Sequence, residues 1–189
     1  NASVFHVSSE EQVILGREGW LFYEPTLDDY MGRSLSDDQL DCAAQYLLSL
    51  QNEAESRGAR FFLTVAPNKN SLYGEYMPSY IPSGHDSSNV ERIKPYLQKY
   101  GINYVDLFPV LSSQEETLYY HGDTHWTDRG AALAADTLLA AMGKTSAYYT
   151  APYSTGEPHM GDLYEMLFPA GREREDSCLY APGFSFTLS

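Results

Sequence analysis

The segment SDDQLDCAAQYLLSLQNEAESRGARFFLTVA, residues 36–66, decides the fold class of this chain. Ser36 stands three residues before Gln39, which is the spacing of a capping box, and apolar residues then recur at helical spacing. Residues 60–66 form a continuous β-prone run that ends at Pro67, as expected for a strand buried on both faces of a sheet. A helix followed by a buried strand predicts one layer of a parallel sheet.

The alternation of helix and strand continues on both sides of this segment. Upstream, residues 13–23 place Gly16 and Gly19 between two apolar runs, which predicts a hairpin. Pro67 to Ser87 has no sustained period and is predicted to be a long loop, and Pro95 indicates a kink or a late start in the helix after it. The other predicted elements are helices at 88–100, 127–143 and 162–167, and strands at 102–107, 117–120 and 184–188.

These elements predict an α/β fold, a three-layer α/β/α sandwich with a mainly parallel sheet. Ligands on such sheets bind beyond the carboxyl ends of the strands. Two segments rich in reactive side chains, residues 67–76 and 121–127, follow predicted strands and fall at that edge. The functional site is therefore expected there.

Composition excludes several classes of function. The chain has 189 residues, of which 26 are acidic and 12 basic, for a formal net charge of -14, so it would repel nucleic acid. No apolar run is long enough to cross a bilayer. Cys42 and Cys178 fit neither a metal-ligand spacing nor a disulfide framework, and whether they pair is left open. The 16 Tyr either stack on sugars and partners or fill partly buried positions.

The sequence HGDTHW, residues 121–126, carries the strongest chemical signal. Asp123 and His125 lie two positions apart just before a predicted helix, so a tight turn can hold the carboxylate against one imidazole nitrogen and leave the other facing a cleft. This is the orienter and base of a catalytic triad. A structural histidine at a helix start is the alternative interpretation.

Four motifs in the same order resemble a known family. They are GREGWLFY (16–23), VAPNKNSLYGEYMP (65–78), YVDLFPVL (104–111) and LYYHGDTHWTDRGA (118–131). Together they resemble the DHHW and alginate O-acetyltransferase-like branch of the SGNH hydrolase-like superfamily. The resemblance implies that Asp123 and His125 are catalytic and that the nucleophilic serine follows them in the chain.

The family's serine lies in a G-x-S motif between a strand and a helix, and no segment after His125 has that form. Ser185 is the nearest match, and Ser154, Ser177 and Ser189 have no better context. The expectation is that the last strand and helix, with the nucleophile, lie beyond Ser189, and that these 189 residues alone are inactive.

Several other residues are candidates for substrate binding. Asn68 and Lys69 follow a predicted buried strand, so an amide could polarise an oxyanion and an ammonium could hold an anionic sugar group. A turn-forming Asn68 and a solvated Lys69 are the alternative. Tyr73 and Tyr120 are predicted to line the cleft, although Tyr120 could equally be a core residue of a strand. Trp126 is expected to pack under the His125 turn.

Two other classes of function stay open. His121, Asp123 and His125 alternate as H-x-D-x-H, which could bind a divalent metal, but further ligands with a defined spacing are missing, and neither a metal nor another cofactor is predicted. The second alternative is a non-catalytic carbohydrate-binding or cell-surface assembly module with a degenerate SGNH site.

The resemblance to this family implies O-acetyl transfer to, or O-acetyl ester hydrolysis on, an extracytoplasmic polysaccharide. The expected partners are a glycan and an acetyl donor or donor-side membrane acetyltransferase, with no nucleic acid. Asn1-Ala2 resembles the remnant of a cleaved tag, so residues 1–12 are assigned to that remnant and an extension, and residues 13–189 to one SGNH-like domain. A signal or anchor is expected to have preceded it.

Overall fold

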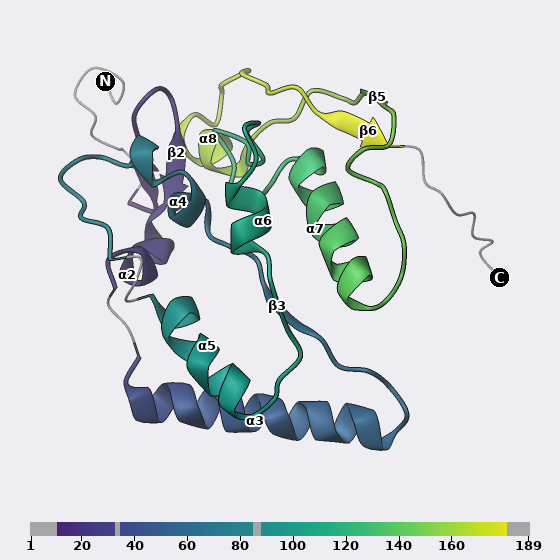
Figure 1. Cartoon of the computed structure of the whole chain (residues 1–189). Helices are drawn as coiled ribbons and strands as arrows, with labels where there is room; N and C mark the ends of the chain where they lie inside the picture. Colours follow the sequence, from purple (N-terminus) through teal and green to yellow (C-terminus); the bar gives the residue numbers. More distant parts are fainter. Residues whose placement is uncertain (1–10, 33–34, 85–87, 181–189) are drawn as a thin grey trace.

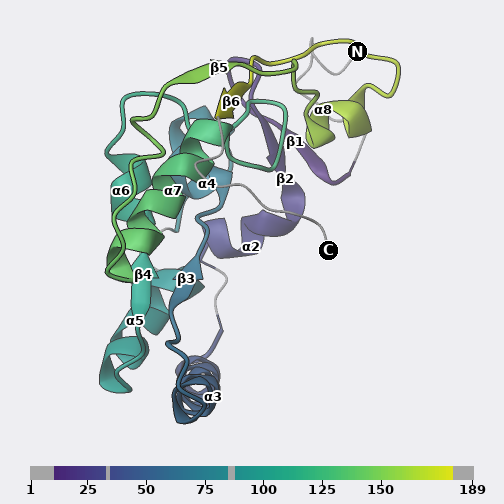
Figure 2. The ribbon, with the colours of Figure 1, turned by 90° about the vertical axis from the view of Figure 1, so that its right-hand side faces the viewer.

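The computed structural model describes residues 11–32, 35–84 and 88–180. Its strands form three two-stranded sheets, of which one is parallel and two are antiparallel. Figures 1 and 2 show the long helix α3 at one end of the molecule and the β1–β2 hairpin, α8 and the β5–β6 pair at the other. The strands are β1 (Val13–Leu15), β2 (Leu21–Tyr23), β3 (Leu63–Val65), β4 (Tyr104–Asp106), β5 (Tyr153–Thr155) and β6 (Cys178–Tyr180).

The predicted N-terminal hairpin is confirmed by antiparallel pairing of β1 with β2. Its turn places Glu18 and Gly19 at positive φ, 55° and 82°. Trp20 and Phe22 enter a core cluster with Met77, so the hairpin packs against the segment that follows β3. The amide of Leu21 donates to the carbonyl of His121 at 2.9 Å, which joins the hairpin directly to the predicted catalytic turn.

The two predicted helices at the α3 end are confirmed. In α3 (Asp37–Ser56), Ser36 and Gln39 form the predicted capping box, and α5 (Asn89–Lys99) is capped by Ser88, so a late start at Pro95 is wrong. Gln51 of α3 donates to the carbonyl of Gly101 at 3.1 Å and accepts from the amide of Asn103 at 3.0 Å, which fixes the chain between α5 and β4.

Helices cover both faces of the parallel β3–β4 pair, which confirms the α/β class. Leu63 and Tyr104 face a cluster built by α3 and α5, whereas Val105 faces a cluster built by α6 (Phe108–Ser112) and α7 (Asp128–Ala141). Side chains of a strand alternate between faces, so this arrangement is a sheet between two helical layers.

The strands themselves are shorter and less buried than predicted. Residues 60–66 were expected to form a strand buried on both faces, but β3 spans Leu63–Val65, and all its residues are half-buried. Within the described residues β3 pairs only with β4, over three positions, so no second neighbour covers its other edge.

Two loop predictions also need correction. The stretch from Pro67 to Ser87 contains two short helices, α4 (Lys69–Leu72) and η2 (Gly74–Tyr76), rather than loop alone. Residues 117–120 do not form a strand; instead an isolated bridge pairs Tyr119 with Trp126 and closes a tight loop around the His125 turn.

The C-terminal part crosses over that loop. The predicted α8 (Asp162–Leu167) is confirmed, and α7 is capped by Thr127 as expected, whereas β5 and β6 were not predicted. The remaining short helices are η1 (Glu24–Thr26) and α2 (Leu27–Tyr30). Cys42 and Cys178 are both free thiols.

Some sequence predictions fall outside the described residues: the strand at 184–188, the candidate serines Ser185 and Ser189, and residues 1–10 of the assigned remnant and extension. In the part of the chain that the structure describes, none of the helices has both the length and the apolar character required to span a membrane.

Candidate active site

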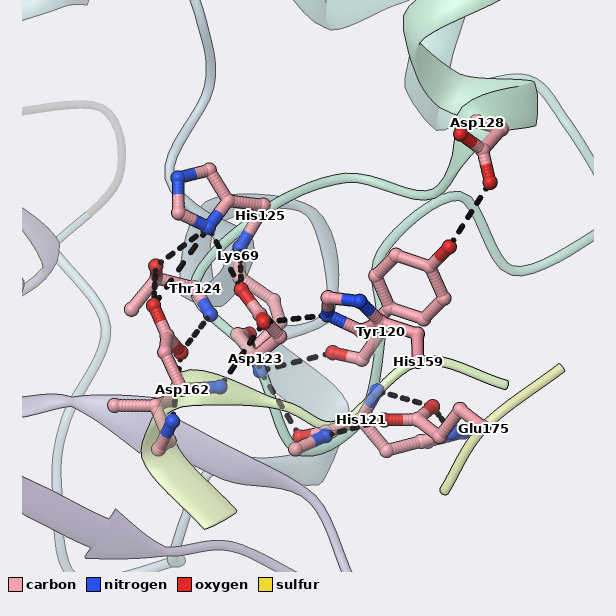
Figure 3. A network of polar contacts seen from close by, with 12 residues as sticks. Lys69, Tyr120, His121, Asp123, Thr124, His125, Asp128, His159, Asp162 and Glu175 are labelled. Carbon is pink, nitrogen blue, oxygen red and sulfur yellow. Dashed lines mark hydrogen bonds and ion pairs between the residues drawn. The ribbon is translucent and has the colours of Figure 1, made fainter. Parts of the chain in front are cut away.

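The His125 turn, residues 121–126, is closed by short backbone bonds. The amide of Thr127 donates to the carbonyl of Leu118 at 2.7 Å, and the amide of Tyr120 donates to the carbonyl of His125 at 3.3 Å. Within this loop Asp123 Oδ1 accepts from the backbone amide of His125 at 2.8 Å and lies 2.7 Å from its Nδ1. The predicted carboxylate–imidazole contact is therefore confirmed (Figure 3).

The two members of the pair differ in exposure in the way that a catalytic base requires. Asp123 is 2% exposed, whereas the side chain of His125 is 75% exposed, with its second ring nitrogen pointing away from the polar network (Figure 3). An ionised carboxylate can only accept, so Nδ1 of His125 carries the proton and Nε2 of the neutral ring is left as an acceptor facing solvent.

The other oxygen of Asp123 is held by residues that sequence reasoning missed. Asp123 Oδ2 lies 2.7 Å from His159 Nε2 and accepts from the amide of Asp162 at 3.0 Å. Although burial disfavours the charge, the hydrogen bonds from His125, His159 and Asp162 lower the pKa of Asp123 to about 2. The carboxylate is therefore ionised over the physiological range of pH.

Asp162, at the start of α8, is a second carboxylate beside the imidazole. It accepts from the amide of Thr124 at 2.8 Å and from the hydroxyl of Thr124 at 2.5 Å, and its Oδ2 lies 3.6 Å from His125 Nδ1. Its only sequence signal was its place at a predicted helix start, whereas His159 lies in a segment without any periodic pattern.

The residues that could together bind a metal ion differ from those of the sequence motif. The ligand atoms of Asp123, His125 and Asp162 lie within 4.8 Å of one another, but His121 Nδ1 lies 2.9 Å from Glu175 and is not part of this group. The alternative of a metal site at H-x-D-x-H therefore loses its first residue, His121. Asp123 already accepts four N–H groups, so a cation at this place would compete with donors that are built into the fold.

Lys69 lies beneath the His125 turn rather than on the rim of a cleft. Its side chain is 6% exposed, and Nζ donates to the carbonyls of Tyr120, His121 and Asp123 at 3.1, 3.0 and 2.5 Å. Burial lowers the pKa of Lys69 to about 7, against the opposing effect of Glu175, Asp123 and Asp162. The predicted contact with an anionic sugar is wrong because all three ammonium donors are used by the backbone.

The contacts of Lys69 still confirm the expected topology. Lys69 follows β3 by four positions, so the His125 turn lies beyond the carboxyl end of that strand. Asn68, the N-cap of α4, instead lines a separate small cavity with Asp106 and Ser88, on the α5 side of the strand pair.

The two predicted tyrosines both have structural contacts. The hydroxyl of Tyr73 accepts from the amide of Leu118 at 2.7 Å, and burial raises the pKa of Tyr73. Tyr120 is buried, its hydroxyl donates to Asp128 at 3.0 Å, and its ring stacks on His159 with centroids 4.2 Å apart. Tyr120 therefore supports the histidine that holds Asp123. Trp126 packs on the core cluster that contains Leu118.

The segment from His159 to Glu175, here called the strap, also holds the His125 turn in place through hydrogen bonds. Glu175 accepts from the amides of His121 and Gly122 at 2.7 and 2.8 Å, and its backbone exchanges two 2.8 Å bonds with His159. Although burial works against it, the contact with the His121 side chain and the bonds from the amides of Gly122 and His121 lower the pKa of Glu175. The turn is thus held by Lys69 from below and by the strap from the side.

This geometry, a buried carboxylate that orients an exposed imidazole in a turn beyond a parallel strand, is that of an SGNH hydrolase-like domain. The family model described as the SGNH hydrolase-like domain of acetyltransferase AlgX matches residues 13–177. The chain therefore belongs to that family.

Its curated relatives include proteins named probable alginate O-acetylase AlgJ. The one from Pseudomonas syringae is 27% identical over 165 residues, which cover 82% of this chain and 41% of that protein. The one from Pseudomonas aeruginosa is 26% identical, with 87% and 43% covered. The chain thus spans less than half the length of these relatives.

Solved structures agree on the fold. The O-acetyltransferase domain of Pseudomonas putida AlgJ has a TM-score of 0.62 at 20% identity, covering 88% of this chain and 63% of that one. Bacillus cereus PatB1 with a sulfonyl adduct also has a TM-score of 0.62, at 14% identity, with 94% and 58% covered.

Proposed function

We propose that the protein containing this chain is a polysaccharide O-acetyltransferase or O-acetylesterase in which Asp123 orients His125 as the general base. The observation that carries the proposal is the 2.7 Å contact between Asp123 Oδ1 and His125 Nδ1, with the carboxylate buried and the imidazole exposed. The relatives named alginate O-acetylases support acetyl transfer to a polysaccharide.

The reaction has two steps. In the first, His125 Nε2 takes the proton of a serine hydroxyl while the serine oxygen attacks the acetyl carbonyl of the donor, and the imidazolium then protonates the leaving oxygen. In the second, Nε2 takes the proton of a sugar hydroxyl, or of water, whose oxygen attacks the acetyl-serine, and the imidazolium returns this proton to the serine oxygen as the bond between that oxygen and the acetyl group breaks. Asp123 stabilises the imidazolium in both steps and remains ionised.

The serine itself is assigned to a segment outside the described residues. Among residues 11–32, 35–84 and 88–180, no serine hydroxyl is hydrogen-bonded to the His125 ring, and Ser177 donates instead to the carbonyl of Glu157 at 2.6 Å. Ser154 bonds weakly across β5–β6 to Leu179, at 3.5 Å. Residues 13–189 are proposed to form one SGNH-like domain that is completed by the segment with the nucleophile.

An extracytoplasmic location and an acetyl donor or membrane acetyltransferase partner belong to the same proposal, by analogy with the relatives. The second candidate function is a non-catalytic glycan-binding module. It is favoured by one observation, a large cavity beside the His125 turn with Trp20, Tyr164 and Phe168 among its lining residues.

Acetyl-ester hydrolysis separates the two candidates. The full protein should hydrolyse 4-nitrophenyl acetate, and His125→Ala should lower kcat/KM on the order of 10⁴-fold. The reason is that loss of one residue of a catalytic triad lowers the rate nearly as much as loss of all three. The matched control is His121→Ala, which removes an imidazole of the same turn that does not contact Asp123. A full protein that is inactive on acetyl esters and acetylated glycans, yet binds glycans, would favour the binding module.

A further inference from the structure

A cavity of about 510 Å³ lies on the side of the His125 turn where the strap crosses it. It is bounded by the β1–β2 hairpin, by His121 and Gly122 of the turn, and by the strap from His159 to Glu175. Sites for small ligands are usually cavities of roughly 300–1,000 Å³ with an apolar lining and a few polar groups. This one has the volume of such a site.

The apolar part of the lining is aromatic. Trp20 is fully buried and its ring meets the His121 ring edge-on at 4.5 Å, and the rings of Tyr164 and Phe168 lie 5.1 Å apart in the same lining. Rigid rings with polar tips suit a ligand that has both an apolar face and hydroxyl groups, as a pyranose ring has.

The charged part of the lining is mainly negative. Glu18, Glu173 and Glu175 contribute carboxylates, whereas Arg174 is the only lysine or arginine among the described residues that line the cavity. The carboxylate of Glu175 lies 2.9 Å from His121 Nδ1. The whole chain carries a formal charge of -14. A carboxylate-bearing sugar would be repelled both near the cavity and from a distance, whereas an uncharged or amino sugar would not.

Two of the residues that line the cavity are also close to Asp123. His159 lines it and also holds Asp123 Oδ2 at 2.7 Å, and Gly122 lines it and directly precedes Asp123. Asp123 and His125 are not among the lining residues, so a sugar unit bound there contacts the residues that flank and hold Asp123 while a neighbouring unit of the same polymer is acetylated.

We propose that this cavity is a subsite for one unit of the acceptor glycan and that this unit carries no carboxylate, being a neutral or amino sugar. The identity of the glycan as acceptor rests on the proposed function, whereas its binding does not. The proposed acceptor sugar differs from that of the relatives named for alginate, because every sugar unit of alginate carries a carboxylate.

The test measures binding by calorimetry at low salt, with the whole chain and three hexasaccharides of matched length: a neutral cello-oligosaccharide, a glucosamine oligomer and an oligomannuronate. We expect the uronate to bind at least about 10-fold more weakly than the other two, with the gap narrowing as salt is added. Glu173→Gln combined with Glu18→Gln should improve uronate binding several-fold, whereas Glu55→Gln on α3 should leave all three affinities unchanged.

A second pair of variants tests the place of binding. Phe168→Ala should weaken binding of the neutral and amino oligomers about 10-fold, whereas Tyr80→Ala, at an exposed ring outside the cavity, should not. Equal or tighter binding of the uronate, no binding of any oligomer, or binding that Phe168→Ala leaves unchanged would overturn the proposal.

The same protein distinguishes this proposal from the function above. His125→Ala should keep the affinities and their order, while abolishing acetyl-ester hydrolysis in the full protein. Selective binding of the oligosaccharides by a protein without acetyl-transfer or esterase activity would refute the proposed function and support the subsite. Acetyl transfer to a uronate acceptor would support the proposed function and refute the subsite.

Discussion

Replacing Asp123 by asparagine tests how the turn is built, because it removes a charge without removing volume. The carboxylate accepts from two N–H groups of His125, from His159 Nε2 and from the amide of Asp162. An asparagine has one acceptor oxygen, so if it keeps the bonds to His125, its NH₂ group faces His159 Nε2 and the half-buried Asp162 amide and leaves that amide without an acceptor.

The magnitude follows from the pKa. A carboxyl with a pKa of about 2 in the folded protein and about 3.9 when unfolded contributes ~2.5 kcal/mol to the free energy of unfolding at neutral pH. Leaving one buried donor unpaired costs about 1–3 kcal/mol, which is of the same size. Asp123→Asn should therefore lower the free energy of unfolding by about 2–3 kcal/mol at pH 7.

The sign of the pH dependence is fixed by the lowered pKa. The stabilisation is complete above about pH 5 and is lost as the pH falls through about 3.9 toward about 2, where the wild-type carboxyl also becomes neutral. Urea unfolding at several pH values should show the two proteins converging in stability over that range. The control Asp38→Asn, an exposed residue in the first turn of α3, should change stability by no more than about 0.5 kcal/mol. A difference at pH 7 below 0.5 kcal/mol, or one that persists unchanged toward pH 2, would refute the reasoning.

Three further changes probe the groups around Asp123. Lys69→Met removes the ammonium donor from the carbonyls of Tyr120 and Asp123, whereas the His121 carbonyl keeps the Leu21 amide, and should cost about 3 kcal/mol in thermal unfolding; Lys144→Met is the exposed control, and equal effects would contradict the role of Lys69. His159→Ala should lower kcat for acetyl-ester hydrolysis about 10-fold and change its pH profile, with partial recovery in His159→Gln; unchanged kinetics would mean that His159 does not position Asp123. Glu175→Gln should cost about 1–2 kcal/mol of stability, more than Glu173→Gln beside it, and the reverse order would show that the strap is not held through Glu175.

The local parts of this structure were predictable because local residues determine them. The capping box at Ser36, the hairpin around Gly19 and the Asp123–His125 contact each depend on side chains within a few positions of one another. Their geometry is fixed by short-range hydrogen bonding and backbone sterics, which the sequence displays directly.

The remaining parts depend on contacts between distant segments. His159 and Asp162 reach Asp123 across 36 and 39 positions, and no periodic pattern marks a strap that crosses a turn. Lys69 was predicted to face a ligand because it follows a strand at the expected site edge, but the three carbonyls that bind it come from a loop more than fifty positions away. The length of β3 was overestimated because its pairing with one neighbour, rather than its composition, sets where it ends.

The central claim is that the Asp123–His125 pair activates a serine for acetyl transfer. Its most direct test is peptide mapping by mass spectrometry of the full protein after brief incubation with 4-nitrophenyl acetate and rapid acid quenching. The account predicts one acetyl group, carried by a single serine outside the described residues, in the wild-type protein and in His121→Ala, and none in His125→Ala. An acetyl group on the same serine in His125→Ala, or acetylation only of lysine or tyrosine side chains, would contradict it.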